Sequence, residues 1–158
     1  MWGFSEPKRG HSVFRVWQEI VRFFAECEEH RKPVSELIGR LQEVPFGMKM
    51  GVIPIFFIAA LLVHDAEVAL YEDGIFTPEL TVESVERLLR IPHKFELRRY
   101  RVEGIRREVF SQIAGILGST MDASRANLVD LMRPLYRFFH QLPHFSRQTK
   151  RLSATTLA

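Results

Sequence analysis

The order of apolar and polar positions predicts helices over most of the chain. Residues 11–31 place apolar and aromatic side chains at three- and four-residue spacing, which is typical of one face of an amphipathic helix. Residues 34–41 repeat this spacing in a shorter helix that begins after Pro33 and ends before Pro45. Residues 52–64 are apolar on every side, and we expect them to form the central and most buried helix.

A β-hairpin and a capped helix are predicted next. The Asp-Gly dipeptide at 73–74 favours a tight turn between strands at 68–71 and 75–77. Thr81 is a good N-cap for the helix that follows. Alternating apolar and polar side chains over 95–102 then indicate a returning strand, whose basic half we expect to leave the core.

The last third of the chain is again predicted to be helical. Residues 103–117 carry one apolar face, and Asp122 or Ser124 can cap a further helix that ends at Pro143. Ser153 resembles an N-cap whose helix would begin just where the sequence ends. That feature predicts a fragment of a larger protein.

Together these elements predict an α+β fold, mostly helical, with about six helices around a small three-stranded antiparallel sheet. We divide the chain into an N-terminal amphipathic helix (1–32), a winged-helix-like core (33–118) and a C-terminal helix with a basic tail (119–158), packed as one compact domain. The hairpin precedes the capped helix, whereas the wing of a typical winged helix follows the recognition helix. Major-groove readout by the capped helix is therefore not expected.

Composition narrows the class of protein. The chain has 158 residues, of which 46% are hydrophobic, so it can bury a substantial core. Its one cysteine, Cys27, excludes an internal disulfide and a cysteine-rich zinc site, and we interpret it as a core residue. The longest uncharged apolar run, Val52–Val63, is shorter than the roughly 20 residues that a membrane span needs. We expect a soluble protein of the cytoplasm without membrane contact.

Charge is distributed unevenly along the chain. Residues 64–86 hold seven acids and no lysine or arginine, residues 87–107 hold eight bases against two acids, and residues 133–151 hold five bases and no acid. Such separation suggests contact with an anionic partner. The candidate nucleic-acid-binding residues are ten of the thirteen cations of the two basic stretches: Lys94, Arg98, Arg99, Arg101, Arg106, Arg107, Arg137, Arg147, Lys150 and Arg151.

Two interpretations of these cations stay open. Guanidinium groups on a strand could hold phosphates, with steep salt dependence and little sequence readout. The strand cations could instead pair with the acids of 64–86, which is slightly favoured because opposed charges across strands are common. The second basic stretch has no comparably placed acids and is the better candidate for an outward contact.

No catalytic or cofactor motif is visible in the sequence. The glycines of 45–51 lack the following Lys-Ser/Thr of a phosphate-binding loop. His140 and His144 have the spacing of zinc ligands on a helix, but Pro143 breaks that geometry. We therefore expect a protein that is not an enzyme and that uses no metal or cofactor.

Two stretches carry a resemblance to a known family. The sequences PFGMKMGVIPIFFIAALLVHDAEVALYEDGIFTPELTVESVERLLRIPHKFEL and RPLYRFFHQLPHFSRQTKRLS resemble a recurring segment of very large bacterial P-loop ATPases, including those of BREX-type phage-defence systems. The resemblance covers roughly residues 33–153. It implies a non-catalytic accessory domain, winged-helix-like, that contacts nucleic acid or other subunits. It transfers no functional residue.

The sequence therefore leaves two candidate functions. The first is a nucleic-acid-contacting accessory domain of a larger bacterial ATPase, in which the basic strand and tail hold phosphates. The alternative is a protein-interaction or scaffolding domain, with a homodimer formed through the aromatic helix at 13–27 as one form of it. Basic residues that converge on one exposed face would favour the first function, and basic residues paired with the acids of 64–86 would favour the second.

Overall fold

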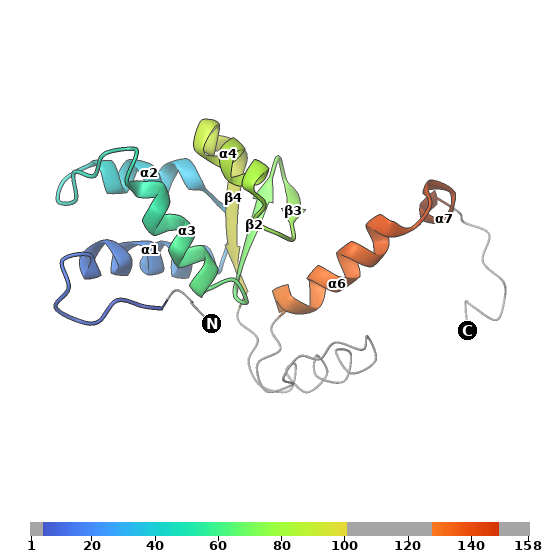
Figure 1. Cartoon of the computed structure of the whole chain (residues 1–158), viewed down its shortest axis with the longest axis horizontal. Helices are drawn as coiled ribbons and strands as arrows, with labels where there is room; N and C mark the ends of the chain where they lie inside the picture. The colour runs from blue at the N-terminus through green and yellow to red at the C-terminus, as the bar shows by residue number, and fades with distance from the viewer. Residues whose placement is uncertain (1–4, 101–127, 149–158) are drawn as a thin grey trace.

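The computed structural model describes residues 5–100 and 128–148 of the chain (Figure 1). The predicted helix at 103–117 and the candidate caps Asp122 and Ser124 lie outside these residues. In chain order, the described elements are α1 (Phe14–Glu26), β1 (Lys32–Pro33), α2 (Val34–Gln42), α3 (Ile53–Val63), β2 (Val68–Glu72), β3 (Ile75–Thr77), α4 (Val82–Arg90), the 3-10 helix η1 (Pro92–Lys94), β4 (Phe95–Arg99), α6 (Leu128–Gln141) and α7 (His144–Gln148).

The described strands form one antiparallel sheet in the order β1-β4-β2-β3. Leu97 at the centre of β4 lies opposite Leu70 of β2 on one side and opposite Lys32 of β1 on the other. The α+β class is therefore confirmed, with four strands where the sequence predicts three. The additional strand is β1, which has two residues and is too short to show a strand period.

The predicted turn and helix cap are both confirmed. Asp73 and Gly74 adopt positive φ angles of 48° and 81°, as a two-residue hairpin turn matched to the strand twist requires. The side-chain oxygen of Thr81 accepts a hydrogen bond from the amide of Ser84 at 3.2 Å, which satisfies one of the open donors at the start of α4.

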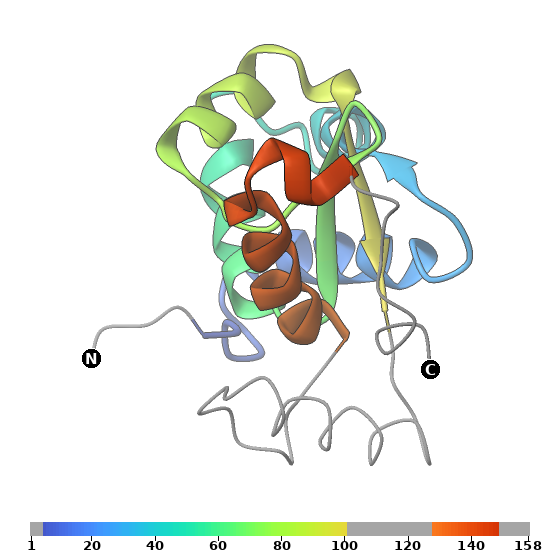
Figure 2. The ribbon, with the colours of Figure 1, turned by 90° about the vertical axis from the view of Figure 1, so that its right-hand side faces the viewer.

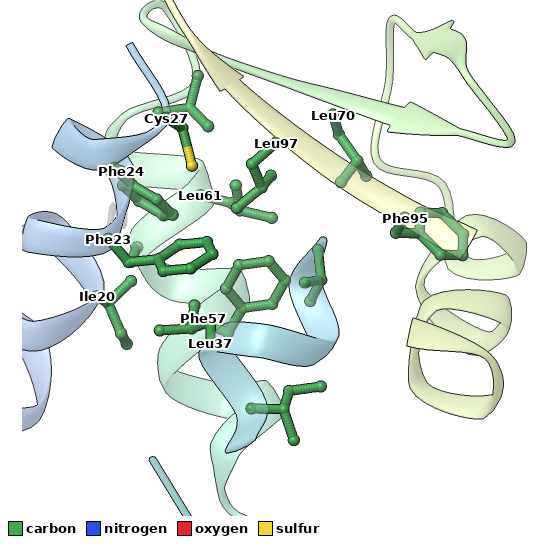
Figure 3. Packing of buried hydrophobic residues seen from close by; sticks show 14 of the residues in the cluster. Ile20, Phe23, Phe24, Cys27, Leu37, Phe57, Leu61, Leu70, Phe95 and Leu97 are labelled. Atoms are coloured by element: carbon green, nitrogen blue, oxygen red, sulfur yellow. The ribbon is translucent and has the colours of Figure 1, made fainter. Parts of the chain in front are cut away.

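One face of the sheet is covered by α1, α2 and α3, and the main core lies in this layer (Figure 1). Successive side chains of a strand point to opposite faces, so alternate residues of β2 and β4 enter the same core. Figure 3 shows side chains from the three helices packed around Leu97. The largest fully buried side chains are Phe23, Phe24, Phe57, Phe95, Ile20, Leu37, Leu41, Ile53, Leu61, Leu88, Leu97 and Val34.

The aromatic face of α1 belongs to this core. Trp17, Phe23 and Phe24 are buried against the same chain, and Cys27 is buried beside them. A homodimer through residues 13–27 would need these side chains at the surface. The fold of the single chain already covers the aromatic face on which that prediction rests.

The apolar helix α3 is not the most buried helix, which corrects a second expectation. Phe57 and Leu61 face the core, but Ile55 is 67% exposed and Leu62 is 44% exposed. A helix that is apolar on every side has no polar face to fix its orientation. Packing against α1 and the sheet buries one side and leaves the other in solvent.

The other face of the sheet carries α6 (Figures 1 and 2). A small second cluster joins them: Ala69 and Tyr71 of β2 and Val129 of α6 are buried together, with Phe76 and Tyr100 packed at the edge. Among the described helices, none combines the length and the apolar character needed to cross a membrane.

Candidate interaction surface

Most described cations of the predicted site are engaged within the chain. Arg99 is 10% exposed and lies 2.7 Å from the carboxylate of Glu67 and 3.5 Å from that of Glu28. Lys94 pairs with Asp73 at 3.2 Å, and Arg137 pairs with Glu79. The pairing interpretation is therefore confirmed for Lys94 and Arg99, because Asp73 and Glu67 belong to the acidic stretch 64–86. The expectation that the second basic stretch has no comparably placed acids is wrong for Arg137, because Glu79 belongs to the same acidic stretch.

The remaining predicted cations differ from these. Arg98 donates to the main-chain oxygen of Glu29 at 2.6 Å and not to a carboxylate. Arg147 is exposed on α7 and makes no ion pair with any described residue. Outside the described residues lie Arg101, Arg106, Arg107, Lys150 and Arg151. The described cations thus do not converge on one exposed basic face.

Helix α3 stands directly before the β2–β3 hairpin, which is the position of the recognition helix relative to the wing in a typical winged helix. Its residues, IPIFFIAALLV, carry no donor or acceptor side chain. Base edges in the major groove are read by side chains such as Arg, Asn and Gln. The helix before the hairpin therefore offers no direct base readout, and its exposed side is apolar.

The sheet face next to α6 carries an arginine–tyrosine cluster. The hydroxyls of Tyr71 and Tyr100 are hydrogen-bonded at 2.7 Å. The guanidinium of Arg31 stacks 3.6 Å from the ring centre of Tyr71, and that of Arg98 lies 5.9 Å from the ring centre of Tyr100. Burial, together with the hydrogen bond to the neighbouring tyrosine, raises the pKa of Tyr71 to about 12.

The same tyrosines line a cavity between the sheet and α6. Its volume is about 160 Å³, and its walls are almost wholly apolar. Arg31, which contributes to this cluster, was missed by sequence reasoning, since it precedes a strand too short to be recognised. The lining residues are Ala69, Tyr71, Phe76, Tyr100, Val129 and Met132.

Helix α6 contacts the body of the protein along one side and exposes several large apolar side chains elsewhere. Towards the body it packs Val129, places Tyr136 edge-on against Phe76, and holds Arg133 3.0 Å from Asp65. The rest of the helix surface exposes four large apolar side chains at three- and four-residue spacing, of which Met132 also borders the cavity on the sheet side. We call this set the outer α6 face: Met132, Leu135, Phe138 and Phe139.

This orientation reverses the usual arrangement of a surface helix, whose apolar stripe faces its own core. Phe138 is 63% exposed, and Phe145 on the next helix, α7, is 81% exposed. Contiguous exposed apolar side chains on a folded protein mark a site of interaction. The outer α6 face is therefore the strongest candidate interaction surface among the described residues.

No arrangement suited to a metal ion occurs in the described part of the chain, where no three His, Cys, Asp or Glu side chains converge. Comparison with protein-family models, with curated proteins and with solved structures gives no match. The geometry of the exposed surfaces is therefore what indicates the function of this chain.

Proposed function

We propose that this chain is a non-catalytic protein-interaction domain of the cytoplasm, an accessory part of a larger bacterial ATPase, and that it pairs copies of the protein that carries it. The observation that carries the proposal is the outer α6 face, which holds large apolar side chains in solvent while Val129, Tyr136 and Arg133 attach the helix to the body. The family resemblance of the sequence supports the ATPase context.

The occupant of this face is a second copy of the same helix. Met132, Leu135 and Phe139 follow the four-and-three spacing of a short coiled-coil seam. The seam contains no charged residue, so two copies meet without repulsion between like charges. An antiparallel two-fold arrangement sets Met132 against Phe139 of the second copy and brings the two Leu135 side chains together.

The energetics favour a weak, concentration-dependent dimer. Four half-buried side chains on each copy contribute on the order of 1 kcal/mol apiece when they are covered completely. Their sum, about 8 kcal/mol, lies within the 4–15 kcal/mol that association costs in lost freedom. The measured mass should therefore rise with protein concentration.

The test is light scattering of the purified 18.4 kDa chain over a range of concentrations. We expect the mass to approach twice that of one chain at high concentration. Phe139→Glu should keep the protein monomeric, because it places a carboxylate in the seam of each copy. The control variant Gln141→Glu adds the same charge at an exposed position near the end of α6, outside the seam, and should still dimerise.

Since Phe139 is about half exposed, neither variant should lower the thermal midpoint of unfolding appreciably. A chain that stays monomeric up to its solubility limit would overturn the proposal. A dimer that survives Phe139→Glu would do the same.

Nucleic-acid contact is the second candidate function, and Arg98 and Arg147 are the observations that favour it. Neither is neutralised by a described carboxylate, so both retain charge for a phosphate. Two phosphate contacts predict that a roughly fourfold rise in salt weakens duplex DNA binding about tenfold. Fluorescence anisotropy with duplex and single-stranded DNA checks this, with Arg98→Gln and Arg147→Gln expected to flatten the salt dependence. Lack of binding at low salt would remove this candidate.

A further inference from the structure

We propose that the cavity between the sheet and α6 is a second binding site, which takes one aromatic side chain of a protein ligand with a carboxylate beside it. This site goes beyond the pairing of two chains through the outer α6 face. It lies on the sheet side of α6, and its walls come from β2, β3 and α6 together with Tyr100. Figure 1 shows α6 standing beside this face of the sheet.

The size of the cavity fits a single six-membered ring. Its volume is about 160 Å³, and an engineered protein cavity of about 150 Å³ with apolar walls stays dry and binds benzene. Aromatic side chains on the walls, among them Tyr71 and Phe76, allow edge-on or offset packing with an incoming ring. Aromatic anchors in such pockets carry much of the energy of protein interfaces.

The chemistry of the walls selects an apolar ring over a nucleobase. Among the described lining residues, the side-chain oxygens are the hydroxyls of Tyr71 and Tyr100, which already bond to each other at 2.7 Å. A base would bring several donors and acceptors into a space that cannot satisfy them. A phenylalanine side chain brings none. The ligand class that fits is therefore a protein segment and not a single-stranded nucleic acid.

Charge beside the cavity specifies what flanks the aromatic ring. Arg31 and Arg98 hold their guanidinium groups against the two lining tyrosines, and one carboxylate, that of Glu96, lies 3.9 Å from Arg31. Arg31 also donates to the main-chain oxygen of Gly74, and Arg98 to that of Glu29. Each guanidinium has five N–H donors, so donors remain for a ligand carboxylate.

The test uses capped tripeptides and amide chemical shifts of the full chain. The first peptide has phenylalanine between two aspartates, the second replaces phenylalanine with alanine, and the third replaces both aspartates with asparagine. We expect millimolar binding of the first peptide, about tenfold weaker binding of the second, and binding a few-fold weaker for the third. Shifts should concentrate around Ala69 and Tyr100.

Two variants locate the binding in the cavity. Ala69→Leu fills the cavity and should abolish binding of the first peptide. Should that buried change unfold the chain, Arg98→Glu serves instead, because Arg98 is not part of the core. It should weaken the aspartate peptide about tenfold and leave the asparagine peptide unchanged. The Phe139→Glu variant should bind the first peptide as tightly as the unmodified chain does, because Phe139 does not line the cavity. This result would distinguish the cavity from the pairing face.

Three results would overturn the inference. One is equal binding of the phenylalanine and alanine peptides, and another is that none of the three peptides binds. The third is a thymidine dinucleotide that binds more tightly than the first peptide and loses its binding in Ala69→Leu, which would assign the cavity to nucleic acid.

Discussion

Replacing Leu61 with alanine is expected to lower the free energy of unfolding by about 2–5 kcal/mol. Leu61 is 2% exposed and points from α3 into the core that Figure 3 shows. The change removes buried methyl groups and leaves a cavity between α3 and its neighbours. Those neighbours are themselves packed in the core and can fill the cavity only in part.

The neighbouring leucine supplies a matched control. Leu62 lies on the same helix and loses the same atoms in Leu62→Ala, but its side chain is 44% exposed. We expect that variant to cost less than about 1 kcal/mol. Urea denaturation of both variants measures the difference. Similar losses at the two positions would contradict the orientation of α3 in this fold.

The second large effect is expected from an ion-pair cluster that joins α1, β1 and α2. The carboxylate of Glu26 accepts hydrogen bonds from Arg40 at 2.7 and 2.8 Å and from Lys32 at 2.6 Å. Arg40 also bonds Glu36 at 2.6 Å and lies 3.6 Å from the buried carboxylate of Glu19. Glu26 is the acid that links all three elements.

These contacts make the stability of the fold depend on pH. Hydrogen bonds from Arg40, followed by those from Lys32, lower the pKa of Glu26 from 4.5 to about 2. A carboxyl group with a lowered pKa stabilises the folded state above its unfolded pKa and loses that contribution as protons bind. The contribution of Glu26 is therefore complete above pH 4.5 and falls between pH 4.5 and about 2.

The expected size of this contribution is about 1–2 kcal/mol, since Glu26 is one-third exposed and solvent screens its pairs. At pH 7 the Glu26→Gln variant should have a free energy of unfolding lower than that of the unmodified chain by this amount. On acidification to pH 3 its free energy of unfolding should fall by less than that of the unmodified chain. Glu29→Gln changes an exposed acid three residues further on, and it should alter neither the stability at pH 7 nor the loss of stability on acidification. Equal acid sensitivity of Glu26→Gln and the unmodified chain would contradict the role of Glu26.

Features set by neighbouring residues could be predicted from the sequence. The Asp73-Gly74 turn follows from the ease with which these residues adopt positive φ, and the cap at Thr81 follows from a hydroxyl placed three residues before an open amide. The short helix after Pro33 and the returning strand at Phe95 follow from local periodicity. All four depend on interactions over a few residues.

The partners of the charged residues could be predicted only in part. Opposite charge on 64–86 and 87–107 indicated pairing, and Lys94 and Arg99 do pair with acids of that stretch. The cluster around Glu26 was missed, because Arg40 meets Glu26 only after α1 and α2 pack together. The contact between Arg31 and Tyr71 was also missed, because it depends on the strand pairing of β1 with β4.

The sequence by itself determined the longer helices and strands of the described residues and the hairpin turn, because backbone propensity and periodicity act locally. The tertiary structure alone decided which faces are covered. It buried the aromatic side of α1, left Ile55 of α3 in solvent and turned the apolar side of α6 outward. Burial depends on which elements meet across the sheet, and periodicity along one helix cannot specify its neighbour. The candidate interaction surface is therefore a property of the assembled fold.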